Sequence, residues 1–312
     1  MSRIHEALKK AEQERASGSS TDVVAPPQEF VTQGSEWAAN QPSAADSPVL
    51  QDVRAGEQAS DYLRFDYLSM HCAHPEWLPD PNVNVFSNTL SSHGAEQFRT
   101  LRSRLYQLRS NQSLRTLLVT SSIPGEGKTF VVANLAQAIV RQPDRRALII
   151  DADLRCARVH TVLGAPPAPG LTDYLRGEAD EMAVIQHGQE ENLCFIPGGN
   201  EVTNPSELLS NGRLKNLLDR VSPVFDWVIL DSPPCLPVAD ASILADMCDG
   251  VLLVVRAGST PRSTAERACQ ELQGRTLAGV VLNAVDESST YGSYYHQYRY
   301  DYGDSKRSDS QT

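Results

Sequence analysis

The chain has 312 residues, a formal net charge of −11 and 40% hydrophobic residues. That length allows one large domain or two small ones, and the hydrophobic fraction is slightly low for a compact chain, so we expect part of it to be unfolded. The acidic balance argues against a general nucleic-acid binder, which would normally be basic. The six cysteines form no Cys-x-x-Cys pair, which argues against a zinc site or a disulfide framework.

The N-terminal residues 1–15 predict a short amphipathic helix, because Ile4, Ala7, Leu8 and Ala11 fall on one helical face. So short a helix is marginal in water by itself, and it is expected to dock either on its own domain or on a partner. The first residues lack the apolar core of a secretory signal, and no apolar run approaches the ~18 residues of a membrane helix. We therefore expect a cytoplasmic protein that reaches the membrane through a partner.

Residues 16–93 are expected to form a linker without much regular structure. Up to about residue 60 the sequence is rich in Ala, Ser, Gln, Pro and Gly, with few large apolar side chains. Residues 61–93 mix aromatic residues such as Trp77 with several prolines, which predicts irregular structure leading into the folded domain.

Residues 94–286 have the pattern of one α/β domain. A helix is expected over AEQFRTLRSRLYQLR and another over TFVVANLAQAIVRQ, with further helical segments at 205–221 and 240–247. Short apolar strands are expected at 114–122, 146–153, 193–199, 225–234, 249–258 and 277–285. Continuous apolar strands that alternate with helices indicate a mostly parallel sheet with helices on both faces.

The stretch SSIPGEGKTF, residues 121–130, lies between a predicted strand and a predicted helix, where a phosphate-binding P-loop must lie. The strict pattern G-x-x-x-x-G-K-[ST] is met except that Ser122 replaces the first glycine. Lys128 is expected to reach the β and γ phosphates of a nucleotide, and Thr129 to hold Mg²⁺. The residues expected around the nucleotide are Pro124, Gly125, Glu126, Gly127, Lys128, Thr129 and Phe130.

Three aspartates follow two of the predicted strands. Asp231 ends an apolar strand in the Walker B arrangement and is expected to bind Mg²⁺. Asp151 and Asp153 end another strand, at the carboxyl edge where open α/β sheets bind ligands. Either is a candidate base or a second group that organises Mg²⁺. A plain helix cap is the alternative role for such residues.

PGEGKT, IDADLR, a Walker B aspartate and a C-terminal tyrosine cluster together resemble the bacterial tyrosine autokinases, the BY-kinases. The similarity extends from about residue 94 to the end, and SRIHEALKKAEQE resembles the start of exopolysaccharide-associated members. The resemblance implies a P-loop NTPase fold and a protein-tyrosine kinase that uses ATP and Mg²⁺. It implies that Lys128, Asp151, Asp153 and Asp231 are catalytic, and that Asp151 or Asp153 takes the tyrosine proton. Asn283 would contact adenine, by analogy with related P-loop ATPases.

The resemblance also implies an assembly and partners. Glu96, Arg99 and Arg102 match the E-x-x-R-x-x-R motif through which these kinases form rings. From the residues alone, the alternative is a Glu96–Arg99 pair within one helix, worth ~0.2–0.5 kcal/mol. The implied partners are a Wzz-like membrane polysaccharide co-polymerase, which would recruit the kinase to the inner face of the membrane, and a phosphotyrosine phosphatase; nucleic acid is not expected.

The C-terminal tail, residues 287–312, is expected to be disordered because it has no aliphatic residues. It holds six of the ten tyrosines in the chain, and we interpret these as the enzyme's own phosphoacceptors, presented to a neighbouring subunit. They are Tyr291, Tyr294, Tyr295, Tyr298, Tyr300 and Tyr302. The alternative for the tail is an aromatic segment that self-associates or stacks on nucleic acid.

Two other functions stay open for the chain as a whole. One is an ATPase switch of the MinD/ParA kind, whose loop carries a second lysine where this chain has Ile123. The other is a nucleotide-binding regulator of polysaccharide export that has no kinase activity.

Overall fold

The structure, a computed structural model, describes residues 63–87, 93–188 and 190–285. The predicted N-terminal helix, residues 16–62 of the predicted linker and the tyrosine-rich tail lie outside the described residues. No helix in the described ranges is long and apolar enough to cross a membrane.

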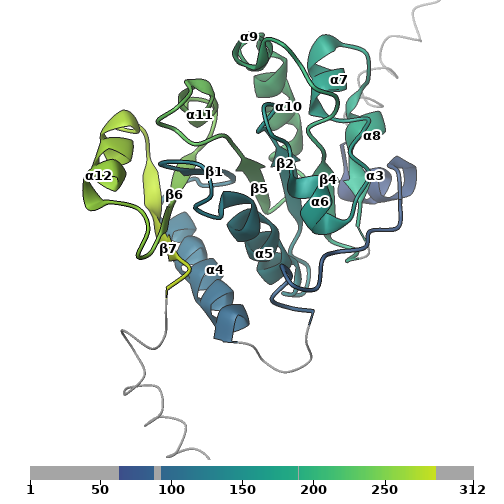
Figure 1. Cartoon of the computed structure of the whole chain (residues 1–312). Coiled ribbons are helices and arrows are strands. Elements are labelled where there is room, and N and C mark those ends of the chain that lie inside the picture. The colour runs from purple at the N-terminus through teal and green to yellow at the C-terminus, as the bar shows by residue number, and fades with distance from the viewer. Residues whose placement is uncertain (1–62, 88–92, 189, 286–312) are drawn as a thin grey trace, which may run out of the picture. The chain divides into compact units, whose positions relative to one another are not determined.

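A seven-stranded sheet lies at the centre of the described domain, in the order β3-β4-β2-β5-β1-β6-β7 (Figure 1). The strands are β1 Thr116–Ser121, β2 Ala147–Asp151, β3 Gln186–His187, β4 Leu193–Ile196, β5 Trp227–Asp231, β6 Gly250–Arg256 and β7 Leu277–Asn283. All pairings are parallel except that of β3 with β4. The mostly parallel sheet is therefore confirmed, and all six predicted strands are present. The additional strand, β3, has two residues and is too short to give a sequence signal.

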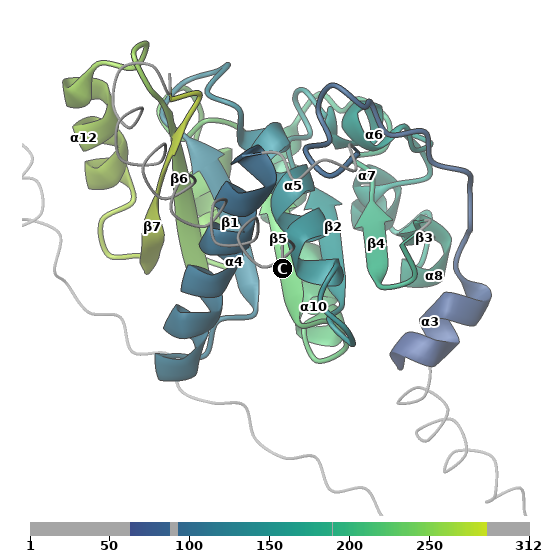
Figure 2. The same cartoon turned by 90° about the horizontal axis from the view of Figure 1, so that it is seen from below.

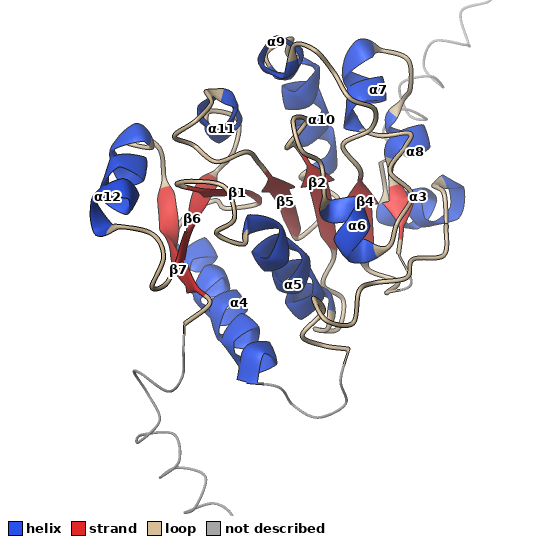
Figure 3. Ribbon diagram, in the orientation of Figure 1, coloured by secondary structure: helices blue, strands red, loops and turns tan. Residues whose placement is uncertain are grey.

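Helices cover both faces of the sheet, as the apolar strands indicate (Figure 3). They are α3 Phe65–His71, α4 His93–Asn111, α5 Lys128–Val140, α6 Val159–Leu163, α7 Leu171–Arg176, α8 Glu181–Val184, α9 Pro205–Leu209, α10 Arg213–Val221, α11 Asp240–Ala245 and α12 Arg262–Glu271. Successive strand residues alternate between two cores, so that in β2 Leu148 and Ile150 join one and Ile149 the other. Residues of α4, α5 and α6 belong to the Ile149 core, and residues of α10, α11 and α12 to the other.

The helical segment predicted over 205–221 is two helices, α9 and α10. The break falls at Ser210, Asn211 and Gly212, where Gly212 has a left-handed backbone with φ of 81°. The Asn211 side chain donates a hydrogen bond to the carbonyl of Leu175 at 2.9 Å, which fixes the turn against the end of α7. An Asn-Gly pair is a turn signal, so the break has a local cause in the sequence.

Residues 63–87, which we call the N-terminal strap, differ from the predicted linker. Phe65, Leu68 and Trp77 are buried in the two cores. Ala73 forms a parallel bridge with Gln186, and its carbonyl accepts the His187 N–H at 2.8 Å. The folded domain therefore begins no later than residue 63 rather than at residue 94, because the aromatic side chains of the strap find apolar surface on the sheet. Figure 2 shows α3 beside the β3 end of the sheet and β7 at the opposite end.

Candidate nucleotide and phosphotransfer site

The glycine turn after β1 leads directly into α5, whose first residue is Lys128. Gly125 and Gly127 have φ of 84° and 96°, the left-handed region that favours glycine. A Cβ atom on Gly127 would lie 2.1 Å from the Asn283 Nδ2 atom, so a side chain here would strain the backbone and displace the Asn283 amide. Ser122 is buried and has no positive φ, which explains why the position tolerates a side chain in place of the usual glycine.

The two acidic strands are neighbours in the sheet, and their aspartates are paired in register. Asp151 at the end of β2 lies opposite Asp231 at the end of β5. The Thr129 hydroxyl donates a hydrogen bond to Asp231 Oδ2 at 2.6 Å. The other carboxylate oxygen, Asp231 Oδ1, is buried and has no hydrogen-bond partner within the described ranges. The fold thus brings Thr129, Asp151 and Asp231 together from three separate parts of the chain.

This donor set fits Mg²⁺, which prefers oxygen ligands and at nucleotide sites takes one or two protein side chains together with phosphate oxygens and waters. The unpartnered Asp231 Oδ1 supplies one such oxygen and the Thr129 hydroxyl a second. In the part of the chain that the structure describes, no group of three or more His, Cys, Asp or Glu side chains is arranged to hold a metal. At such nucleotide sites, phosphate oxygens and waters would supply the remaining ligands of Mg²⁺.

The carboxylates of the site share a buried, mutually repulsive environment. Burial raises the pKa of Asp231 to about 7, although the Thr129 hydrogen bond and the Lys128 charge act in the opposite direction. Burial, followed by repulsion from Asp231, raises the pKa of Asp151 well above its ordinary value. Burial also raises the pKa of Asp153, and the Lys128 charge opposes that shift. A divalent cation would offset this clustered negative charge.

Asp151 and Asp153 have different surroundings. Both carboxylate oxygens of Asp151 accept backbone N–H groups, from Val159 at 3.0 Å and from Asp153 at 3.3 Å. Val159 begins α6, whose N-cap position is Arg158, so Asp151 accepts an N–H group at the start of that helix from eight residues upstream. Asp153 Oδ1 accepts the Cys156 N–H at 3.1 Å.

Asn283 lies at the phosphate loop, because its Nδ2 atom donates to the Glu126 carbonyl at 2.9 Å. The Glu126 side chain is buried and accepts the Ile123 N–H at 2.8 Å and the Thr260 hydroxyl at 2.5 Å. These contacts tie the loop to the end of β7 and to the segment that follows β6. The role of Asn283 toward adenine stays a prediction.

Arg155 is a site residue that the sequence reasoning missed. Its guanidinium makes two hydrogen bonds to the fully buried carboxylate of Asp240, at 2.7 and 3.1 Å, and one to the Ser206 hydroxyl at 3.0 Å. These bonds anchor the segment two residues after Asp153 to α9 and α11. No local pattern joins Arg155 to partners so far along the chain.

The E-x-x-R-x-x-R residues of α4 already make contacts within the chain. Glu96 and Arg99 form the intrahelical pair that was the alternative reading. The Arg102 guanidinium donates to the Ala138 carbonyl at 2.5 Å, close to the end of α5. Glu96 keeps 60% of its side chain exposed, so a contact with a second subunit stays a prediction.

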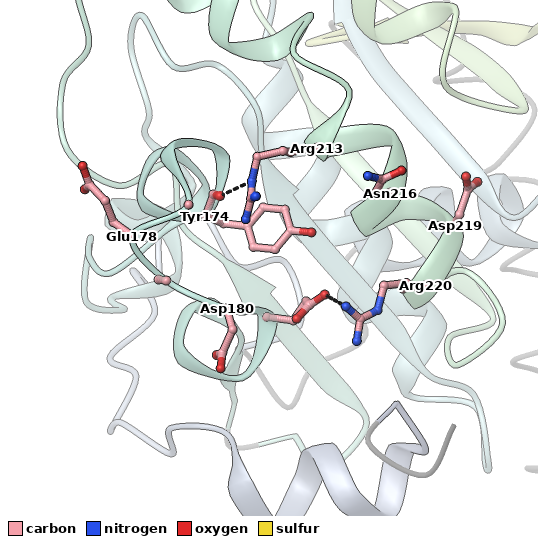
Figure 4. Close-up of a pocket in the computed structure, with 10 residues that line it drawn as sticks. Tyr174, Glu178, Asp180, Arg213, Asn216, Asp219 and Arg220 are labelled. Atoms are coloured by element: carbon pink, nitrogen blue, oxygen red, sulfur yellow. Dashed lines mark hydrogen bonds and ion pairs between the residues drawn. The ribbon is translucent and has the colours of Figure 1, made fainter. Parts of the chain in front are cut away.

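A pocket of about 700 Å³ lies between α7, α8 and α10 (Figure 4). Arg213 stacks over the ring of Tyr174 at 5.0 Å, and Arg220 pairs with Glu181. None of the predicted site residues lines this pocket. We assign it no role in nucleotide binding.

The glycine loop, the paired strand-end aspartates and the parallel sheet define a P-loop nucleotide-binding protein. Residues 115–265 match a family model described as an AAA domain. Tyrosine-protein kinase YwqD of Bacillus subtilis is 35% identical over 207 residues, which cover 65% of this chain and 87% of YwqD. The putative tyrosine-protein kinase EpsB of Ralstonia solanacearum is 38% identical over 210 residues, which cover 66% of this chain but 28% of EpsB.

The solved kinase domain of the Escherichia coli tyrosine kinase ETK has a similar fold. Its TM-score is 0.58 at 33% identity, and the match covers 64% of this chain and 80% of that one. The chain therefore belongs to the bacterial tyrosine-protein kinases, the BY-kinase family of enzymes. The family resemblance noted in the sequence is confirmed.

Proposed function

We propose that this chain transfers the γ-phosphate of ATP to tyrosines of its own C-terminal tail. The observation that carries the proposal is the pair of Thr129 and Asp231 beside the phosphate loop, with one buried Asp231 oxygen left unpartnered. That arrangement leaves an oxygen ligand for Mg²⁺ where a β- and γ-phosphate would lie. Family membership supports tyrosine as the acceptor.

The roles of the residues follow from their positions. Backbone N–H groups of residues 125–129, at the start of α5, would bind the phosphates, and Lys128 would neutralise their charge. Thr129 and Asp231 would hold Mg²⁺, which when bound supplies further charge neutralisation at the β and γ oxygens. We propose that Asn283, which lies at the phosphate loop, contacts the adenine.

Phosphotransfer also needs a base, since a tyrosine hydroxyl has a pKa of about 10. The phenol oxygen attacks the γ-phosphorus, the bond to the β–γ bridging oxygen breaks, and ADP leaves. The phenol proton goes to a carboxylate, for which Asp153 is the better candidate because Asp151 is fully buried, whereas Asp153 keeps some exposure and lies near the Lys128 charge. The raised pKa of Asp153 makes it a stronger base than an exposed aspartate.

The acceptor tyrosines are proposed to come from a neighbouring copy in a ring that forms through Glu96, Arg99 and Arg102. This part of the proposal is supported by the E-x-x-R-x-x-R motif, by the exposed Glu96 side chain and by the position of the tyrosines in the tail. We further propose that tail phosphorylation regulates exopolysaccharide polymerisation or export at the inner face of the membrane. A Wzz-like co-polymerase would activate the kinase there, and a phosphatase would reset it.

The test is phosphotyrosine formation on purified protein supplied with ATP and Mg²⁺. Lys128→Met should lower the initial rate at least ~100-fold, because a group that stabilises transition-state charge is lost. Lys215→Met is the matched control, since Lys215 lies on α10 in an exposed pair with Asp219 and should leave the rate unchanged. A rate that survives Lys128→Met would sink the kinase proposal. ATP binding without any phosphotyrosine would favour a nucleotide switch or a regulator that lacks kinase activity.

A further inference from the structure

Strand β7, at one edge of the sheet, carries an uncovered apolar face. Six large hydrophobic side chains are exposed within the described ranges, and four of them lie in β7 or just after it. These four, with their exposed fractions, are Leu277 at 41%, Val280 at 53%, Leu282 at 59% and Val285 at 41%. A cluster of this kind on one strand marks a surface that another segment covers.

Val280 and Leu282 extend a core that α12 covers only in part. In the parallel register they lie beside Leu253 and Val255 of β6, and both of those residues are buried. Ala268 of α12 joins the same core as Leu253 and Val255. The apolar surface therefore continues across β7, beyond the area that α12 protects.

The backbone of β7 is open on its outer side as well. Within the described ranges β7 pairs with β6 alone, so a row of N–H and C=O groups faces away from the sheet. Such an edge is a template for one more strand, and proteins normally cover it or place charges on it. Here it is apolar, which favours a strand with large side chains on one face.

The chain itself supplies a segment of that kind in the tail that follows β7. In Tyr298-Arg299-Tyr300-Asp301-Tyr302 the tyrosines occupy every second position, so in an extended conformation all three would lie on one face. The tail has no aliphatic residues with which to build a core of its own. The β7 edge offers the aliphatic partners that the tail lacks, and a cross-strand pair of an aromatic with a β-branched residue such as Val280 is favourable.

We propose that residues 298–302 add to the free edge of β7 as an antiparallel strand of the same chain, with their tyrosines packed beside Val280 and Leu282. Residues 286–297 would form the connection, and the tether gives the docked segment a high effective concentration. If the tail is the substrate, as proposed above, the docked form withholds acceptor tyrosines from the kinase site. Each phosphate added to the tail brings a charge of about −1.5 to −2, which disfavours return to an apolar face.

The test measures docking without ATP, so that it does not depend on kinase activity. Chymotrypsin cleavage after Tyr298, Tyr300 and Tyr302 is followed by mass spectrometry in the full chain. The double variant Val280→Asp, Leu282→Asp should be cleaved there about tenfold faster than the wild type, the change expected when several cross-strand pairs are lost. The matched control is Met70→Asp, Leu78→Asp, which changes the two exposed apolar residues that lie away from β7 and should leave the rate unchanged.

A second experiment changes the tail instead of β7 and measures the hydrogen exchange of the β7 amides. In the full chain, Tyr298→Asp, Tyr300→Asp, Tyr302→Asp should speed hydrogen exchange of the β7 amides, whereas Tyr291→Asp, Tyr294→Asp should not. Equal cleavage of wild type and the β7 double variant, with unchanged exchange in β7, overturns the proposal. If dilution removes the protection of the wild-type tail from chymotrypsin, the proposal is also overturned, because a second copy would then cover the β7 edge. A chain that docks its tail but forms no phosphotyrosine leaves the docking intact and contradicts only the proposed function.

Discussion

The two edges of the sheet differ in how they are covered (Figure 2). At the β3 edge the N-terminal strap supplies both a backbone partner, the Ala73 carbonyl, and a buried side chain, Trp77. At the β7 edge the described residues supply neither, and Val280 and Leu282 stay exposed. Among the described residues, a separate segment is thus fixed at the β3 edge and none is fixed at the β7 edge.

The difference bears on function because the open edge is the one that reaches the phosphate loop. Asn283 ends β7 and donates a hydrogen bond to the Glu126 carbonyl within that loop. A segment that binds along β7 would therefore contact a strand that is itself hydrogen-bonded to the phosphate loop. The strap at the other edge contributes none of the predicted site residues.

The largest expected effect comes from removing the anchor of the covered edge. Trp77 is 2% exposed and packs edge-on against Phe195, with ring centroids 6.0 Å apart. Trp77→Ala should lower the free energy of unfolding by about 3–5 kcal/mol, as expected for a buried tryptophan. Urea denaturation measures this, with Leu78→Ala as the control, because Leu78 is 72% exposed and should change stability by no more than about 0.5 kcal/mol. Equal effects of the two changes would mean that the strap does not hold the edge.

A smaller effect should follow from pushing the strap away from α6. Gly164 ends α6 with φ of 62°, and a Cβ atom there would lie 2.0 Å from the Leu78 carbonyl oxygen. Gly164→Ala should therefore cost about 2–4 kcal/mol, from backbone strain plus the clash. The control is Gly212→Ala, where φ is 81° but no atom lies within 4 Å of the new Cβ, so strain alone should cost about 1–2 kcal/mol. If thermal denaturation gives the same loss for both variants, Gly164 makes no steric contact with the strap.

The smallest effect is expected at the open edge. Val280→Ala removes a side chain that is already 53% exposed, so the free energy of unfolding should change by about 0.5 kcal/mol or less. Urea denaturation monitored by tryptophan fluorescence measures it against the Trp77 variant. A loss above about 2 kcal/mol would show that β7 is covered as tightly as β3, and the contrast between the edges would be wrong.

The sequence was sufficient to predict those elements whose pattern lies within a few neighbouring residues. The apolar runs of β1, β2 and β4–β6 predicted those strands because they are buried on both faces, and the run of β7 predicted a strand, which lies at the edge and is only partly covered. PGEGKT predicted the position of the phosphate loop, and the strand-end aspartates predicted its acidic neighbours. What could not be predicted depends on distant partners. The strap lies on the sheet because Trp77 packs against Phe195 and Gly188, which are distant from it in the sequence. Arg155 is likewise held by Asp240, 85 residues further along the chain.

Transfer between copies is tested by mixing two chains, one without a working phosphate loop and the other without acceptor tyrosines in its tail. One carries Lys128→Met with an intact tail, and the other carries an intact phosphate loop with all six tail tyrosines changed to phenylalanine. With ATP and Mg²⁺, we expect phosphotyrosine on the tail of the Lys128→Met chain, because a neighbouring copy supplies the catalytic site. Neither chain should be phosphorylated on its tail when it is incubated alone. If the wild type phosphorylates its tail but the mixture leaves the Lys128→Met tail unmodified, transfer between copies is contradicted. Phosphotyrosine on the Lys128→Met chain alone would contradict the phosphate loop as the source of the reaction.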